Sequence, residues 1–216
     1  MKGILSISII CLLLLFPGCI SPYFTTGNDL YLKPATVFLN DGTIKEGNIT
    51  IQLENNVEAT NYIDLVNKET RQAEKISIFT IKYYRIGNDY YVPKMVDLNL
   101  NGGHNFLFLK RLTDENSRIQ LYELQEVHKR TSTGDERKLY YISLPSLGRY
   151  EVLSTYGKRL SPDFPEKMSN IVADCPSLAK KIRDREVGYF LGNFIIPDSK
   201  RVEVLMRIIA EYDSCR

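Results

Sequence analysis

Alternating hydrophobic and polar residues dominate residues 31 to about 156 and predict β-strands. The clearest pair is Thr36–Asn40 and Thr43–Ile51, which flank Asp41-Gly42. Asp-Gly can supply the two positive φ angles of a type I′ turn, so we predict a β-hairpin with this turn. The second strand alternates regularly, as expected of a sheet that has one face in water.

Further runs of the same kind follow along the chain. Ile76–Ile86 is predicted to be one strand, Gly87–Asp89 a turn, and Tyr90–Val92 the returning strand. Pro93 cannot donate a hydrogen bond to a neighbouring strand, so it indicates a sheet edge or a strand end. Three more strands are predicted at Phe106–Leu112, Arg118–His128 and Lys138–Leu144.

The pattern changes to a helical period after Ser161-Pro162. Pro165–Ala173 can form a short helix, and Asp174-Cys175-Pro176 supplies an N-cap residue and a proline before a second one. The last segment is the clearest helix. Asp198 can cap it, and apolar residues recur there at steps of three and four: Val202, Leu205, Met206, Ile209 and Tyr212.

These elements predict an α+β fold. We expect an antiparallel β-sheet or roll, with a partly barrel-like sheet as one form of it, over residues 31–156. A helical C-terminal region, residues 157–216, is expected to pack on this β-rich domain.

The N-terminus has the layout of a bacterial lipoprotein signal. A positive charge precedes the apolar stretch Ile4–Phe16, and Pro17-Gly18 stands directly before Cys19. The apolar stretch is shorter than the roughly 20 residues that a membrane-spanning helix needs. We therefore expect residues 1–18 to be removed as a signal peptide, Cys19 to carry lipid, and residues 19–30 to form a tether.

Lipidation would place the protein in the cell envelope. Anchoring by more than one acyl chain is stable, whereas a single chain binds a membrane only marginally. No Asp follows Cys19, which by resemblance to enterobacterial sorting argues against retention in the inner membrane, and no acidic run resembling a surface-export signal follows it. We therefore expect an outer-membrane anchor with the domain facing the periplasm.

Two of the four cysteines form a candidate disulfide. Cys11 leaves with the signal and Cys19 is acylated, so Cys175 and Cys215 remain in an oxidising compartment. A disulfide between them would close a loop of about 40 residues and stabilise the fold by about 4 kcal/mol through chain entropy. Two free thiols, or a pair of metal ligands, are the alternative.

Composition and motifs restrict the possible functions. The formal net charge is +2 without a basic cluster, which argues against a nucleic-acid partner. The chain has neither G-x-S-x-G nor a Gly-rich phosphate loop. His104 and His128 have no partner at metal-ligand spacing. We therefore expect no metal, no cofactor and no catalytic residue.

Four of the 14 tyrosines form a candidate ligand surface. Tyr83, Tyr84, Tyr90 and Tyr91 lie on two strands joined by a tight turn, so alternation places one member of each pair on each face of the sheet. One face could bind a sugar or a partner protein, because Tyr offers a large area and a hydroxyl at low entropy cost. The alternative is aromatic packing between strands.

Three short motifs carry a resemblance: Phe38–Gly47, Lys82–Tyr91, and Asp174–Leu178 together with Glu211–Cys215. They resemble motifs of uncharacterised secreted proteins and lipoproteins of Bacteroidetes. Phe38–Gly47 resembles their N-D-G hairpin opening, and Lys82–Tyr91 is similar to their second strand pair. Asp174–Leu178, with Glu211–Cys215, resembles their C-terminal helical end. That family has no established activity and no assigned ligand residues, so the resemblance implies a fold and a compartment only.

Together these features predict a cell-envelope lipoprotein that is not an enzyme and that binds or scaffolds another envelope component, a protein or a glycan. Two other functions stay open. A hydrolase acting on envelope glycan or peptide would need a cleft with convergent carboxylates, or a His beside a Ser. A small-ligand carrier would need an apolar pocket inside the β-rich domain.

Overall fold

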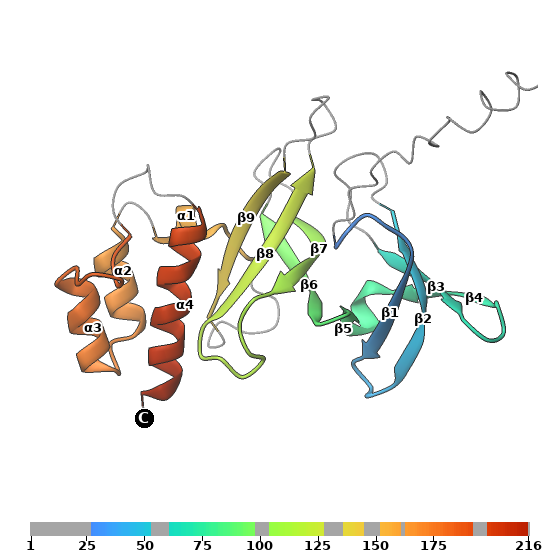
Figure 1. Ribbon diagram of the computed structural model, residues 1–216, viewed down its shortest axis with the longest axis horizontal. Coiled ribbons are helices and arrows are strands. Elements are labelled where there is room, and N and C mark those ends of the chain that lie inside the picture. The colour runs from blue at the N-terminus through green and yellow to red at the C-terminus, as the bar shows by residue number, and fades with distance from the viewer. Residues whose placement is uncertain are drawn as a thin grey trace, which may run out of the picture.

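The computed structural model describes seven segments of the chain: residues 27–52, 61–97, 104–127, 136–144, 152–160, 163–191 and 198–215. Within them, nine strands form one antiparallel sheet, and four α-helices follow in the sequence (Figure 1). The predicted signal peptide, Cys19 and His128 lie outside the described residues.

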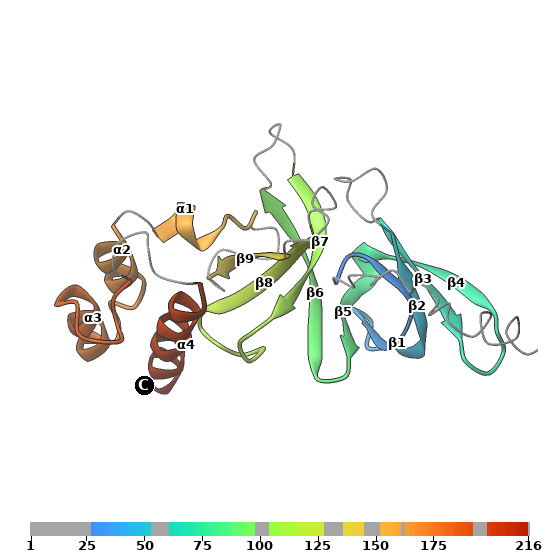
Figure 2. The same ribbon diagram turned by 45° about the horizontal axis from the view of Figure 1, so that its top comes forward.

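The strands form a single open sheet. They are β1 (Leu30–Leu39), β2 (Ile44–Ile51), β3 (Tyr62–Asn67), β4 (Ala73–Ser77), β5 (Ile81–Ile86), β6 (Asp89–Asp97), β7 (His104–Arg111), β8 (Gln120–Val127) and β9 (Glu136–Ser143). Their spatial order is β4-β3-β2-β1-β5-β6-β7-β8-β9, so β4 and β9 are the edges (Figures 1 and 2). A short 3-10 helix, η3 (Ile78–Thr80), joins β4 to β5.

Helices make up the C-terminal part of the structure. They are α1 (Tyr156–Leu160), α2 (Phe164–Ile171), α3 (Pro176–Arg183) and α4 (Asp198–Ser214). The predicted α+β fold, with an antiparallel sheet first and helices at the C-terminus, is therefore confirmed. No helix in the part of the chain that the structure describes has the length and apolar character needed to cross a membrane.

Hydrophobic clusters lie on both faces of the sheet, and β7 shows how they divide. Phe108 packs with the inner side chains of β1–β5, whereas its neighbours Leu107 and Leu109 point to the opposite face and pack with β8 and β9. Leu153 completes this second cluster, because its N–H and carbonyl bond β6 at Met95 and Asp97. The two parts of the sheet therefore bury opposite faces.

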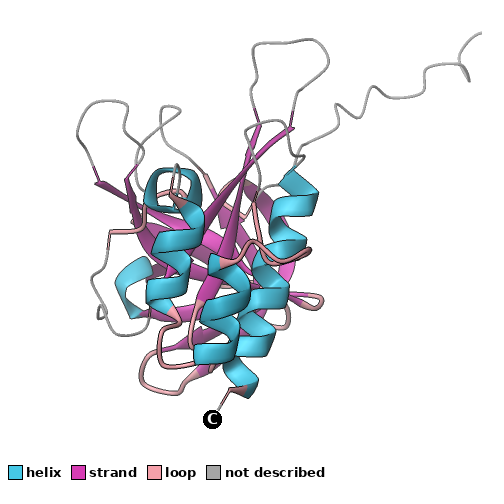
Figure 3. Ribbon diagram, turned by 90° about the vertical axis from the view of Figure 1, so that its left-hand side faces the viewer, coloured by secondary structure: helices cyan, strands magenta, loops and turns pink. Residues whose placement is uncertain are grey.

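The helices cover the remaining face of β8 and β9. Leu121, Tyr140 and Ile142 alternate with the residues of the second cluster and pack against apolar side chains of all four helices. In Figure 3 the helices lie in front of the strands. The periodic residues Leu205 and Ile209 of α4 are buried in this layer, as the helical pattern predicted.

The β1–β2 hairpin forms where predicted, but its turn is of a different type. The Leu39 N–H donates to the Thr43 carbonyl, and only Gly42 within the loop has a positive φ, of 88°. The predicted type I′ turn is therefore wrong, and the loop has three residues with glycine in the left-handed position. Asp41 instead accepts the Thr43 N–H on its carboxylate at 2.8 Å, which is compatible with a negative φ.

The predicted strand Ile76–Ile86 is divided by η3. β4 pairs with β3 at the edge of the sheet, whereas β5 pairs with β1. Asn40 holds this change of direction, since its N–H donates to the Thr80 carbonyl and its Nδ2 to the Phe79 carbonyl, both at 2.9 Å. The break therefore depends on a residue far away in sequence. β3 has no counterpart among the predicted strands, although Ile63 and Leu65 alternate with polar neighbours.

Pro93 lies inside β6, so the predicted strand end is wrong. The pairing of β6 with β5 ends at Tyr91, and beyond it Met95 and Asp97 bond Leu153 with the same edge. By strand alternation the backbone nitrogen of Pro93 points to the same edge of β6 as the backbone of Met95 and Asp97. Along that edge, Pro93 lies between the end of the pairing with β5 and the contact with Leu153. Pro93, which lacks an N–H, therefore still occupies an unpaired stretch of strand edge.

The end of the expected tether is packed into the domain. Asn28 is 2% exposed; its Nδ2 donates to the Phe108 carbonyl at 2.9 Å, and its Oδ1 accepts the Phe108 N–H at 2.7 Å. Leu30 is buried as well. Asn28 lies in a polar segment, and such a residue suggests a loop. In the structure its side-chain amide instead bonds the backbone N–H and carbonyl of Phe108 in β7.

Candidate functional site

Three aromatic rings and one arginine gather where β1, β5, β6 and β7 meet on the outward face. We call Phe38, Tyr83, Tyr90 and Arg111 the aromatic surface. Phe38 and Tyr83 are register partners whose rings stack with centroids 4.4 Å apart, and Tyr90 meets Tyr83 edge-on at 5.5 Å. The three rings are partly buried, so neighbouring groups fix their positions while part of each ring remains accessible.

Arg111, the last residue of β7, sets a positive charge against these rings. Its guanidinium carbon lies 5.2 Å from the Tyr90 centroid and 5.9 Å from that of Tyr83, within the range of cation–π attraction. Only 10% of its side chain is exposed. Among the described residues, no acceptor reaches its buried Nε. The cation is stabilised by the rings and by Glu115, whose Oε2 lies 3.7 Å from Nη1.

An ion pair borders the aromatic surface. Lys82 donates to Glu115 at 2.9 Å, and the Lys82 ammonium lies 5.8 Å from the Tyr83 centroid. The hydrogen bond from Lys82 lowers the pKa of the Glu115 carboxyl, and the same bond raises the pKa of Lys82. Both groups are therefore charged at neutral pH, and the region carries two cations with one anion.

Alternation divides the four candidate tyrosines between the two faces, as the pattern indicated. Tyr84 is fully buried, stacks on Tyr91 at 4.8 Å and meets Phe108 edge-on. Its hydroxyl donates to the Gly27 carbonyl at 2.5 Å, and burial raises its pKa well above the ordinary value. Tyr84 and Tyr91 therefore belong to the core packing, and Tyr83 and Tyr90 remain for a ligand.

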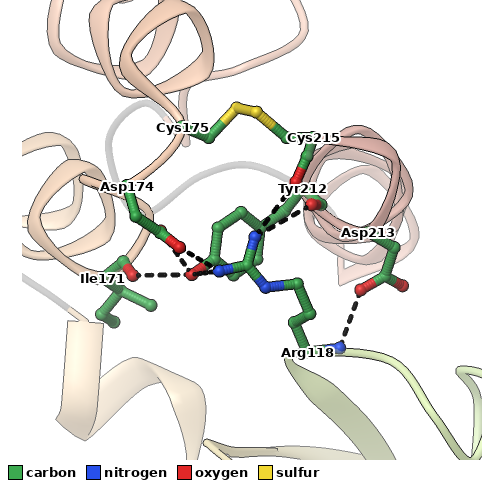
Figure 4. Close-up of polar contacts among 7 residues, drawn as sticks. All are labelled: Arg118, Ile171, Asp174, Cys175, Tyr212, Asp213 and Cys215. Carbon is green, nitrogen blue, oxygen red and sulfur yellow. Dashed lines mark hydrogen bonds and ion pairs between the residues drawn. A yellow bond between two sulfur atoms is a disulfide. The ribbon is translucent and has the colours of Figure 1, made fainter.

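A polar cluster beside the disulfide joins the sheet to the helices (Figure 4). The sulfurs of Cys175 and Cys215 lie 2.02 Å apart, so the predicted disulfide is present. Arg118, between β7 and β8, donates from Nη2 to the Tyr212 hydroxyl at 2.8 Å and to the Asp174 carboxylate. This cluster connects α4, the start of α3 and the sheet, which is a structural role.

Asp174 does not cap α3, contrary to the prediction. Cys175 occupies the N-cap position without a side-chain cap bond, and the helix begins at Pro176. The Asp174 carboxylate accepts hydrogen bonds from Tyr212, at 2.7 Å, and from Arg118 instead. These two bonds lower the pKa of Asp174. Tertiary partners thus replace the local cap that the Asp-Cys-Pro sequence suggested.

The described residues assemble no set of three His, Cys, Asp or Glu that could hold a metal ion. His104 begins β7, opposite Asp97 in the register. A groove of about 520 Å³ lies open at the surface beside β4 and η3, where Asn40, Asp41 and Phe79 contribute to its walls. It is open to solvent, and Asp41, Glu74 and Lys75 bring charge to its walls, whereas a small-ligand carrier is expected to enclose an apolar pocket inside the β-rich domain.

No protein-family model, curated protein or solved structure matches this chain. The candidate site is therefore assigned from its own geometry. The structure gives the glycines of the Phe38–Gly47 motif a conformational explanation: Gly42 has a positive φ, and a Cβ on Gly47 would lie 2.5 Å from the Val66 carbonyl oxygen.

Two members of the aromatic surface, Phe38 and Arg111, were not predicted from the sequence. A single arginine at a strand end carries no local signal, and its contact with Tyr90 depends on the pairing of β6 with β7. The register between Tyr91 and Lys110 places Arg111 opposite Tyr90 once both strands are assigned. Knowledge of the β6–β7 pairing would therefore have been enough to predict that Arg111 lies beside Tyr90.

Proposed function

We propose that this protein is a lipid-anchored cell-envelope protein that binds another envelope protein through the aromatic surface and catalyses no reaction. The observation that carries the proposal is the packing of the Arg111 guanidinium against Tyr83 and Tyr90 on the outward face. Tyr and Arg are among the residues that contribute most to protein–protein binding, especially where neighbouring groups hold them in place.

The arrangement of the rings favours a protein over a glycan. A sugar stacks on a free aromatic face, but the Tyr83 ring stacks on Phe38, and Lys82 and Arg111 both lie near it. A protein partner can instead contact ring edges and the guanidinium together. The Lys82–Glu115 ion pair at the border would then orient an approaching partner by its charge.

The anchor is the second part of the proposal. Lipid on Cys19 would hold the domain at the outer membrane, facing the periplasm, with Gly27 eight residues further along the chain. Confinement to a surface raises the effective concentration of a partner in the same membrane, so a modest interface can be sufficient.

The proposal is tested by photo-crosslinking in intact cells, with a photoreactive phenylalanine analogue at position 83 and the lipidated chain otherwise unchanged. We expect one discrete crosslinked protein. In the same chain, Tyr90→Ser should reduce that product about tenfold or more, because it removes a central contact. Val187→Ser is the control, since Val187 follows α3, is 98% exposed and belongs to no surface proposed to bind.

Equal crosslinking in the Tyr90→Ser and Val187→Ser variants would contradict a role for the aromatic surface. Sedimentation with purified envelope glycan that Tyr90→Ser abolishes would replace the protein partner with a glycan. Metabolic labelling with a fatty acid, lost in Cys19→Ala, checks the anchor separately. Urea unfolding of each variant must match the parent chain, so that loss of binding is not loss of folding.

A further inference from the structure

β1 begins with a bulge that turns two apolar side chains outward. Leu30 pairs with Ile51 and Lys33 with Ile49, so Tyr31 and Leu32 together oppose Thr50. Leu32 has a φ of 48° and donates its N–H to the Thr50 hydroxyl at 3.2 Å. A positive φ is uncommon for Leu, because its Cβ clashes with the backbone. The structure thus holds a disfavoured conformation at this point.

The bulge exposes residues that usually lie in the core. Tyr31 is 67% exposed and Leu32 42% exposed, whereas Leu30 is buried. Tyr62 is 53% exposed and lies on the same face, since its neighbour Asp64 pairs with Thr50. We call Tyr31, Leu32 and Tyr62 the bulge patch. Side chains of this size stay in water only at a cost, so an exposed group of them indicates a contact surface.

The bulge patch lies close to the proposed lipid anchor along the chain. Gly27 follows Cys19 by eight residues, so a fully extended chain keeps it within about 27 Å of the lipid. Tyr31 is four residues further on. In Figure 1, β1 starts near the top of the group formed by β1–β4, and the β1–β2 turn lies at the bottom of that group. The patch is therefore at the end of β1 that the tether reaches.

We propose that the bulge patch rests on the membrane surface that holds the lipid anchor. This inference rests on the proposed anchor at Cys19. Tyr is enriched at the level of lipid headgroups, where its ring is in an apolar layer and its hydroxyl in a wet one, and Leu adds apolar area. The contact fixes the domain on the bilayer, in addition to tethering it.

The charges around the bulge patch indicate that the contact is apolar. On the face that carries the bulge patch, Lys75 lies opposite its register partner Asp64, so the two charges balance. The Lys75 ammonium lies 5.6 Å from the Tyr62 ring centroid, and the carboxylate of Asp64 on the paired strand offsets its charge. Binding therefore does not require anionic lipids and is insensitive to salt.

The absence of Trp from the sequence allows a direct test. Tyr31→Trp and Tyr62→Trp each introduce a single tryptophan into the bulge patch of the full lipidated chain. Ile44→Trp is the matched control, because Ile44 is 58% exposed and lies about 20 Å away at the other end of β2. Each variant is reconstituted in phosphatidylcholine vesicles whose acyl chains are brominated near the headgroup.

We expect bromine to quench the tryptophan of Tyr31→Trp and Tyr62→Trp at least about twofold more than that of Ile44→Trp, equally in neutral and anionic vesicles. Equal quenching at all three positions, in protein that floats with the vesicles, overturns the membrane contact and leaves the anchor intact. Quenching that needs anionic lipid and disappears in salt overturns it too. Protein that does not float, or a Cys19→Ala chain that floats equally well, overturns the proposed anchor instead.

Discussion

The guanidinium carbon of Arg118 lies 3.6 Å from the ring centroid of Tyr212, which places a cation from the β7–β8 connection directly on a ring of the last helix. The same arginine donates from Nη1 to the carbonyls of Tyr212 and Cys215, and its N–H donates to the Asp213 carboxylate at 2.7 Å. It therefore satisfies carbonyls at the C-terminal end of α4, where a cation also complements the helix dipole.

Replacing Arg118 should weaken the attachment of α4 to the sheet. Arg118→Met keeps much of the apolar stem but removes the cation–π contact and the donors, so we expect a loss of about 2 kcal/mol in the free energy of unfolding. Urea unfolding followed by circular dichroism measures it. Lys180→Met is the control, because Lys180 pairs with Asp184 on an exposed helix surface and should change stability little. Equal losses in both variants would contradict the role of Arg118.

The stabilising contribution of Asp174 should depend on pH in a defined direction. Hydrogen bonds from Tyr212 and Arg118 hold its pKa in the folded protein below the ordinary value of 3.8. A carboxyl with a lowered folded pKa stabilises the fold above its unfolded pKa, and that contribution is lost as pH falls through the folded pKa. Asp174→Asn should therefore be less stable than the parent at pH 7.

The difference between the parent chain and Asp174→Asn should shrink as pH falls below about 4, because the unfolded parent then binds a proton that the folded parent binds only at lower pH; the charge contribution is lost once the folded carboxyl is protonated as well. Urea unfolding at a series of pH values between 7 and 2.5 gives this curve. A difference that stays constant over the whole range would show that charge at Asp174 contributes nothing. Asp184→Asn, at an exposed position of the same helix region, serves as the control.

The disulfide should stabilise the whole fold through the unfolded chain. Cys175 and Cys215 are 40 residues apart, and a closed loop of that length contributes about 4 kcal/mol by chain entropy. The double variant Cys175→Ser, Cys215→Ser should lose that amount in urea unfolding. Reductant should destabilise the parent chain to a similar extent and leave the double variant unchanged. If reductant affects both chains equally, the loss has another cause.

Most elements could be predicted because their signals are local. β7, β8 and β9 follow from alternation, α4 follows from its three- and four-residue period, and the disulfide follows from counting cysteines in an oxidising compartment. The division of the four tyrosines between two faces is also local, because it depends only on the alternation of side chains along two strands.

The remaining features depend on partners that are distant in sequence. η3 interrupts an apolar run because Asn40 bonds Phe79 and Thr80, and no residue within that run predicts it. The Asp174 side chain leaves its helix terminus for Arg118, which is 56 residues away. Arg111 joins the candidate site only through strand register. In each case a tertiary contact overrides a local preference, and a single sequence does not contain the pairing.

The two glycines at positions 47 and 157 should respond in opposite ways to alanine. At Gly47 a Cβ would lie 2.5 Å from the Val66 carbonyl oxygen, which belongs to the backbone of the paired strand β3 and cannot rotate away. We expect Gly47→Ala to cost about 2 kcal/mol or more of unfolding free energy, as overpacking does.

At Gly157, in α1, a Cβ meets no described atom within 4 Å. Gly157→Ala should therefore be neutral or add up to about 1 kcal/mol, because alanine is the better helix former. Thermal unfolding of both variants separates the two cases, and a stable Gly47→Ala chain would show that β2 and β3 can move apart.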